Sequence, residues 1–215
     1  HTYSVAGTYD VSVSGGLQQI NFNNGGDKSK LTDIKQWGDI AWTSLGNAFR
    51  GCASLNAVSA TDAPDLSGVT NMGFAFALCT NLQSMNVVSW DVSNVTSLFA
   101  AFAANPNMAT LDVSNWTTTS VTNLAYCFQD SPLFDYSLAN WDINQVTSFV
   151  DFLDGGTLST PNYDATLISW AAQAPSMNEA ISFGGSQYTL GGAAEAARTT
   201  LTTTYNWTIA DGGGI

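Results

Sequence analysis

The chain has 215 residues and a net charge of −12, and only 10% of its residues are charged. A chain of this length can bury a sizeable core as one domain. With 5 basic residues against 17 acidic ones, it cannot neutralise a run of phosphates, so nucleic-acid binding and binding to an anionic membrane surface are disfavoured. No apolar run approaches the roughly 18 residues of a membrane-spanning helix, so membrane insertion is not expected.

The low share of charged residues means that the surface must be built largely from Ser, Thr, Asn, Gln and Gly. Such a surface suits an environment outside the cell, and we expect an extracellular protein. The sequence begins with His1 rather than Met and ends in a Gly-rich tail. We therefore expect a processed product or a piece of a longer protein.

The first element expected along the chain is a strand over residues 7–13, where side chains alternate in character. Residues 1–15 resemble the last strands of a PKD-like immunoglobulin-type domain, although the segment is far too short to form one. We expect residues 1–36 to form a β-rich N-terminal cap, because the end of an array would otherwise expose its core.

A phrase recurs through the middle of the chain. It begins with a β-branched or aromatic residue followed by Thr, and large apolar residues stand three and seven places after the start. The five copies begin at residues 42, 69, 95, 121 and 146, in steps of 27, 26, 26 and 25. A fixed period of this size predicts a stacked array and not a compact fold around one pocket.

The second copy shows the structure expected of each repeat. Val69, Met72 and Phe76 are spaced like one face of a short helix, and residues 82–87 have the pattern of a short strand. We therefore predict an α/β solenoid over residues 37–158. It is a leucine-rich-repeat coil of about five repeats, each with a short helix and a short strand.

Three runs carry a resemblance to a known family: NAFRGCASL at 47–55, SNVTSL at 93–98 and LDVSNW at 111–116. They resemble repeats of the BspA-like leucine-rich-repeat surface protein family, which read M-F-x-x-C-x-x-L, L-D-(L/V)-S-x-(W/F)-D and V-T-x-M. Asn105 and Ser131 replace the family Cys, and Thr117 replaces the Asp. The resemblance covers residues 37–154 and implies a non-enzymatic recognition or adhesion role at a bacterial cell surface.

The last part of the chain has a different pattern. Residues 163–173 and 192–203 are typical of helices, and residues 180–183 and 206–210 are typical of strands. We predict that residues 159–215 form a mixed α/β C-terminal cap with a linker-like tail.

Two sets of residues in equivalent repeat positions are interpreted as structural. A repeated Trp could serve as a platform for sugars, but Trp at the core period favours a buried role. Cys52 and Cys79 lie one repeat apart, so a disulfide is the alternative to buried thiols that satisfy turn backbone. We favour thiols. The predicted structural ladder comprises Cys52, Cys79, Asn105, Ser131, Trp37, Trp90, Trp116 and Trp141.

No cofactor and no catalytic machinery are expected. Asp65, Asp91 and Asp142 occupy equivalent turns, where bonds to their own turn backbone are favoured over a Ca²⁺ ladder. Calcium needs about 6–8 oxygen ligands, and Thr117 interrupts the row. Zinc and Ser–His–Asp chemistry are disfavoured because His1 is the single histidine.

The predicted contact face consists of the outward positions between core residues of the strands. These positions are Ser84, Asn86, Val88, Thr110, Asp112 and Ser114. We expect them to present a polar surface to a protein or glycan partner on a cell or particle surface. Two alternatives remain: a phage virion component with the same solenoid, such as a tail fibre, receptor-binding or capsid-decoration protein, and an accessory domain of a secreted enzyme.

Overall fold

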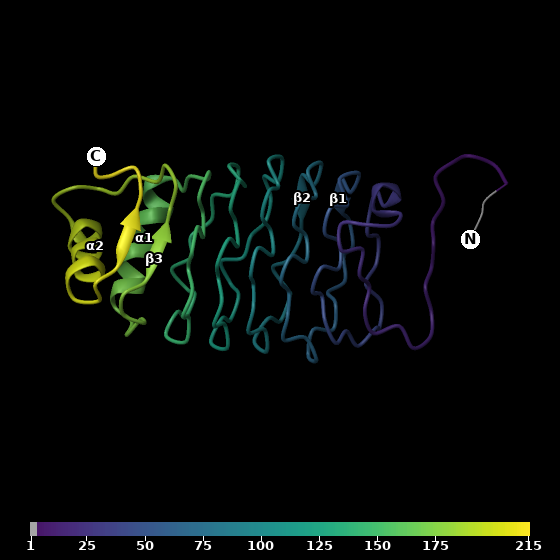
Figure 1. The fold of residues 1–215 in the computed structure, drawn as a ribbon, viewed down its shortest axis with the longest axis horizontal. Helices are drawn as coiled ribbons and strands as arrows, with labels where there is room; N and C mark the ends of the chain where they lie inside the picture. Colours follow the sequence, from purple (N-terminus) through teal and green to yellow (C-terminus); the bar gives the residue numbers. More distant parts are fainter. Residues whose placement is uncertain (1–3) are drawn as a thin grey trace.

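The computed structural model describes residues 4–215. It is an elongated molecule in which successive loops of the chain lie side by side, with the first and last described segments at opposite ends (Figure 1). We call each loop a layer and number the layers from the starts of the recurring phrase. Layers 1 to 5 begin at residues 42, 69, 95, 121 and 146.

Regular secondary structure is sparse. The described elements are a short 3-10 helix η1 (Lys28–Lys30), strands β1 (Ala57–Val58), β2 (Ser84–Met85), β3 (Ala180–Ser182) and β4 (Thr208–Ala210), and helices α1 (Thr160–Ala171) and α2 (Ala193–Thr203). β1 pairs in parallel with β2, and β3 pairs in parallel with β4.

The predicted α/β solenoid is wrong. Within residues 37–158 the structure has no α-helix, and its strands there, β1 and β2, have two residues each. The rest of this range consists of turns and loops, so it is not a leucine-rich-repeat coil of five helix-plus-strand repeats. The period instead produces a stack of turn-and-loop layers joined by backbone hydrogen bonds.

The secondary structure predicted at the C-terminal end of the chain is confirmed, whereas the strand predicted at the N-terminal end is wrong. Both C-terminal helices and both C-terminal strands form, as α1, α2, β3 and β4. The strand predicted over residues 7–13 does not form, and the described part of the N-terminal segment has no strand before β1. Residues 1–3 lie outside the described part of the chain.

The backbone conformation explains why the layers contain no helix. In every layer the residues five and nine places after the start have positive φ, which ends any right-handed helical turn. The apolar spacing comes instead from single turns, such as the bond from the N–H of Ala75 to the carbonyl of Met72 (3.0 Å). The positive-φ residues are Asn47, Gly51, Phe74, Leu78, Ala100, Ala104, Tyr126, Asp130, Asp151 and Gly155.

These turns direct backbone N–H groups to the following layer. Asn47 donates to the carbonyl of Gly73 (2.8 Å), and Phe74 in turn donates to Phe99 (2.8 Å). Tyr126 donates to Val150 in the same way (2.8 Å). The row therefore replaces the hydrogen bonds that a helix would form within itself.

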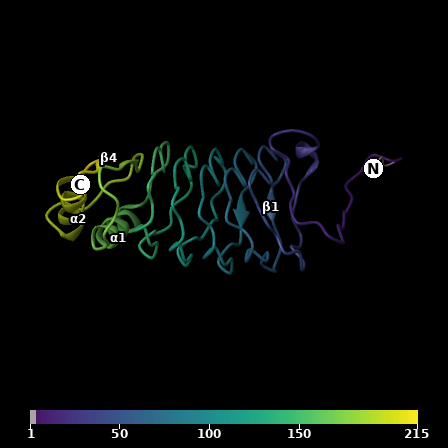
Figure 2. The ribbon, with the colours of Figure 1, turned by 60° about the horizontal axis from the view of Figure 1, so that its bottom comes forward.

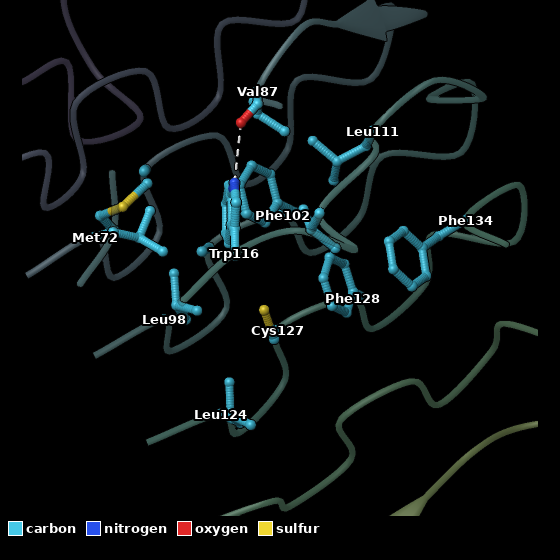
Figure 3. Packing of buried hydrophobic residues seen from close by; sticks show 14 of the residues in the cluster. Met72, Val87, Leu98, Phe102, Leu111, Trp116, Leu124, Cys127, Phe128 and Phe134 are labelled. Atoms are coloured by element: carbon cyan, nitrogen blue, oxygen red, sulfur yellow. Dashed lines mark hydrogen bonds between the residues drawn. The ribbon is translucent and has the colours of Figure 1, made fainter. Parts of the chain in front are cut away.

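Aromatic side chains stack in register inside the layers. The rings of Phe49 and Phe76 are 4.9 Å apart, and the next two steps, to Phe102 and then Phe128, are 6.0 and 5.8 Å. Figure 3 shows Phe102 and Phe128 beside Trp116, which donates from Nε1 to the carbonyl of Val87 (3.0 Å). Each fully buried Phe contributes about 2–3 kcal/mol of transfer free energy.

The N-terminal end of the stack is closed by a loop. Phe22 and Asn24 donate backbone hydrogen bonds to the carbonyls of Ala48 (3.0 Å) and Arg50 (2.9 Å). Gly51 has φ +76°, and a Cβ at this position would overlap Oδ1 and Cγ of Asn24. Glycine is therefore required where the loop meets layer 1.

The C-terminal end is closed by α1, α2 and the β3–β4 pair (Figure 2). Leu153 donates its N–H to the carbonyl of Ser182 (2.9 Å), which continues the stack. Asp211 accepts from Arg198 (2.7 Å) and from the hydroxyl of Tyr163 (2.7 Å). This hydrogen-bonded pairing raises the pKa of Arg198 and fixes the chain end against both helices.

Replacing Ala104 by Gly tests the positive-φ positions. Ala104 has φ 57°, a conformation that costs a non-glycine residue about 1–2 kcal/mol. We expect Ala104→Gly to leave the free energy of unfolding unchanged or raise it by up to about 1 kcal/mol.

The matched control is Ala103→Gly at the neighbouring buried position, which is not a positive-φ residue. We expect it to lower stability by about 1 kcal/mol, from lost burial and added chain entropy. Urea unfolding of both variants measures the difference. Equal destabilisation by the two changes would contradict the account.

Candidate functional site

The outward side of the strand segments carries the predicted contact face. Met85 and Val87 are buried, whereas Asn86 and Val88, which follow them in alternation, are exposed. Layer 3 repeats this alternation. An isolated bridge between Ser84 and Thr110 places the two segments side by side.

A hollow of about 370 Å³ lies on this face, and we call it the strand-face hollow. Its lining includes five of the six residues of the predicted contact face, and Ser114 is not among the lining residues. Its lining residues are Val58, Ser59, Ala60, Thr61, Ser84, Met85, Asn86, Val88, Thr110 and Asp112.

The strand-face hollow has an apolar floor and a polar rim. Val58, Ala60 and Met85 are buried beneath it, and hydroxyl and amide side chains surround them. Asp112 is the one ionisable lining residue, and its Oδ1 accepts from the N–H (3.0 Å) and Oγ (2.6 Å) of Ser114. Such a site offers short neutral donors and acceptors around a small apolar surface.

Sequence reasoning missed the part of the hollow that layer 1 contributes, residues 58–61. These residues precede Pro64, which stands where other repeats have Trp, so the repeat pattern gave no strand there. The signal that was available is the alternation of Val58 and Ala60 with Ser59 and Thr61.

The three aspartates considered for calcium bond to their own turns. Oδ1 of Asp65 accepts from the N–H of Ser67 (3.0 Å), Asp91 from Ser93 (3.0 Å) and Asp142 from Asn144 (2.9 Å). The hydrogen bonds from Ser67 and Ser93 lower the pKa of Asp65 and of Asp91. Among residues 4–215 no group of three or more His, Cys, Asp or Glu side chains is arranged to hold a metal ion.

The Cys column satisfies backbone carbonyls of the preceding layer. The thiol of Cys79 donates to the carbonyl of Phe49 (3.2 Å). Asn105 donates to Phe76 (3.0 Å), and Ser131 donates to Phe102 (2.8 Å). Cys52, Cys79 and Cys127 are buried free thiols.

The Trp column is also internal, with 0–4% exposure for Trp37, Trp90, Trp116 and Trp141. Trp141 donates from Nε1 to the carbonyl of Val113 in the preceding layer (2.9 Å). Trp37 and Trp90 meet edge to face at 5.3 Å, because the smaller Pro64 occupies the layer between them. The structure therefore presents no Trp platform on the surface at these positions.

Sequence reasoning gave no role to the Thr of the recurring phrase. Its hydroxyl donates to the carbonyl of the equivalent residue one layer earlier: Thr96 to Thr70 (3.1 Å), Thr122 to Thr96 (3.1 Å) and Thr147 to Thr122 (3.3 Å). Thr43 donates to Gln18 in the same way (3.3 Å). The phrase thus marks a second interlayer ladder.

Comparison with known proteins places the repeats in a family. Residues 43–165 match the family described as "Mycoplasma protein of unknown function, DUF285". The chain belongs to the DUF285 family. No curated protein and no solved structure matches the chain.

The DUF285 match begins one residue after the start of layer 1 and ends inside α1. It contains the strand-face hollow and the Cys column. Over the described residues, neither α1 nor α2 has the length and apolarity to cross a bilayer.

Replacing Asn105 in the DUF285 segment tests the Cys column. Asn105→Ala leaves the carbonyl of Phe76 without its side-chain donor and leaves that of Phe102 with Ser131 alone, so we expect a loss of about 1–3 kcal/mol in unfolding free energy. Asn105→Cys supplies the thiol found in layer 2 and should recover part of this loss.

The control for this measurement is Asn107→Ala. Asn107 also donates to the preceding layer, at the carbonyl of Thr80 (2.8 Å), but it is exposed. We expect a cost below about 0.5 kcal/mol there. Chemical denaturation of the three variants measures their unfolding free energies. Equal losses of unfolding free energy in Asn105→Ala and Asn107→Ala would contradict the role given to Asn105.

Thiol labelling tests the burial of the three cysteines. Burial raises the pKa of Cys52 to about 11 and raises the pKa of Cys79 and of Cys127 well above the ordinary value. Because the thiolate is the reactive form, native protein at pH 8 should react with Ellman's reagent at none of the three, whereas protein in urea should react at all 3.

Proton linkage gives this prediction a second readout. An acid whose pKa is higher in the folded state stabilises the fold below its unfolded pKa and loses that contribution as pH rises. Unfolding free energy should therefore begin to fall above the ordinary thiol pKa of about 8.5 and continue falling toward pH 11. Rapid native labelling at pH 8 would contradict both expectations.

Proposed function

We propose that the protein is a non-enzymatic recognition or adhesion module that binds a protein or glycan partner through the strand-face hollow. One observation carries the proposal: five outward residues from two successive layers converge, with residues 58–61, on a single hollow with an apolar floor and a polar rim. Ligand sites combine these two features, since apolar contact supplies affinity and a few polar groups fix orientation.

The chemistry of the rim favours recognition over catalysis. Asp112 is its one ionisable lining residue, and that carboxylate is occupied by Ser114. A pair of acid and base groups, or a nucleophile with its base, is what acid–base or covalent catalysis requires. Hydroxyl and amide side chains both donate and accept, which suits the hydroxyls of a glycan or the amides of a peptide.

The rim is held on a hydrogen-bonded framework. Met85 donates to the carbonyl of Thr110 (2.9 Å), and Ala109 donates to Gln83 (3.0 Å). Side chains on such a framework are already placed before a ligand arrives, so binding costs less ordering entropy. This supports a preformed surface.

A location outside the cell is part of the proposal. The resemblance of the repeats to the BspA-like surface proteins supports it, as does a sequence with only 10% charged residues. Fold alone does not give function, so the test must address the strand-face hollow itself.

Arrays of glycans and of surface proteins, probed with the labelled protein, test the proposal. Thr110→Lys places a long charged side chain at the rim and should weaken binding by about tenfold or more. Thr110 is exposed, so stability should change by no more than about 0.5 kcal/mol.

Thr117→Lys is the matched control, because Thr117 is an exposed Thr outside the lining. It carries the same change in charge and should leave binding unaltered. The proposal fails if bound ligands are unaffected by Thr110→Lys, or if both variants lose binding equally.

A further inference from the structure

A second hollow, of about 300 Å³, shares no residue with the strand-face hollow. We call it the aromatic groove. Its residues come from layers 1 to 4, so it runs along the stack. They are Arg50, Phe74, Ala77, Leu78, Phe99, Ala100, Ala103, Ala104, Tyr126 and Gln129.

The aromatic groove has a row of rings above a floor of small residues. Phe74 and Phe99 meet edge to face at 5.0 Å, and Phe99 and Tyr126 do so at 5.4 Å. All three rings are half-buried. They pack on the buried alanines 77, 100 and 103, in a cluster separate from the main core.

Three of the bulky residues that line the aromatic groove have an unfavourable backbone conformation. Phe74, Leu78 and Tyr126 have φ values of 57°, 62° and 59°. A bulky residue pays about 1–2 kcal/mol for this left-handed conformation, and it is unusual for side chains of this size.

Equivalent positions in other layers show that the fold does not need bulk there. The position of Phe74 and Tyr126 is Asn47 in layer 1 and Asp151 in layer 5, and the position of Leu78 is glycine in both. Strain that the layer does not require is found where side chains have a further role. Partly exposed rings at these sites point to a ligand that covers them.

Arg50 stands at the layer 1 end of the groove. Its guanidinium carbon lies 4.2 Å from the centre of the Phe74 ring, and Nη1 donates to Oδ1 of Asn47 (3.3 Å). Its Nε is buried without a hydrogen-bond partner among residues 4–215. Arg50 is the only basic residue in 43–165, and no carboxylate is among the lining residues.

Carboxylates stand at the opposite end. Asp130 occupies in layer 4 the positive-φ position that Leu78 has in layer 2 and Ala104 has in layer 3. Its N–H donates to the carbonyl of Asp154 in layer 5 (2.8 Å). Both aspartates are exposed. The groove is therefore positive at its layer 1 end, apolar in its middle and negative at its other end, in layers 4 and 5.

We propose that the aromatic groove binds an extended apolar peptide segment that carries a carboxylate at the Arg50 end and a basic residue at the Asp130 end. Aromatic faces and alanine methyl groups contact its apolar side chains, and the two charged ends fix its orientation. Three layer steps of about 4.8 Å separate Arg50 from Asp130, and a fourth step reaches Asp154 in layer 5. The four steps span about 19 Å, the length of about six extended residues.

An array of immobilised hexapeptides tests the proposal. The probes are Glu-X-X-X-X-Lys peptides with acetylated N-termini and the central positions drawn from Ala, Val, Leu, Phe and Pro. The comparison set has Lys in place of Glu. We expect the protein to prefer the Glu set by about tenfold or more. A protein of net charge −12 attracts the doubly basic set non-specifically, so this preference could not arise from net charge.

Phe74→Asn separates binding from folding, because Asn occupies the equivalent position in layer 1. Asn tolerates positive φ, so the midpoint of thermal unfolding should stay the same or rise, while binding falls about tenfold or more. Arg50→Gln should abolish the preference for Glu over Lys. Thr110→Lys should leave peptide binding unchanged, which separates this groove from the strand-face hollow.

Five results would overturn the proposal. The Lys set could bind as well as the Glu set, or no hexapeptide could bind above background. Phe74→Asn could retain full affinity, or it could lower the unfolding midpoint by several degrees, which would make the rings structural. Binding to a neutral glycan array that is lost in Phe74→Asn would assign the groove to sugars and would also overturn it.

Discussion

The structure depends on the row of backbone hydrogen bonds that joins each layer to the next. That row exists because two residues per layer adopt positive φ, which turns N–H groups away from their own segment and toward the neighbour. Backbone groups buried between layers would otherwise lack partners, at a cost of about 1–3 kcal/mol each. The bonds also fix the register, and register brings Phe49, Phe76, Phe102 and Phe128 into one stack.

Packing and polar ladders follow from that register. Once equivalent residues face each other, a Thr hydroxyl, a thiol or an Asn amide can reach the carbonyl one layer earlier. Irregularities have local consequences. Pro64 in the Trp position lets Trp37 contact Trp90 across a layer. A stack that accepts such a replacement also allows its outward residues to vary, and outward residues line both hollows.

The sequence predicted the period, the C-terminal helices and strands, and five of the ten residues that line the strand-face hollow, because each leaves a pattern in the spacing of apolar residues. It failed on the helix within each layer. Val69, Met72 and Phe76 have the spacing of a helix face, yet Phe74 between them has φ 57°. Gly and Asn commonly adopt positive φ and so indicate it in a sequence, whereas a Phe gives no such indication. The aromatic groove was missed for the same reason, since two of its three rings, Phe74 and Tyr126, occupy such positions.

The direction of the interlayer row makes the two ends of the stack chemically different. Its carbonyls point to the preceding layer and its N–H groups to the following one, so along this row one end offers acceptors and the other offers donors. Such ends are complementary, and bare stacks would join head to tail into open filaments. The loop at 22–24 and the residues around Ser182 occupy these ends. Together they cover the backbone groups that a second copy of the stack would need in order to join this row.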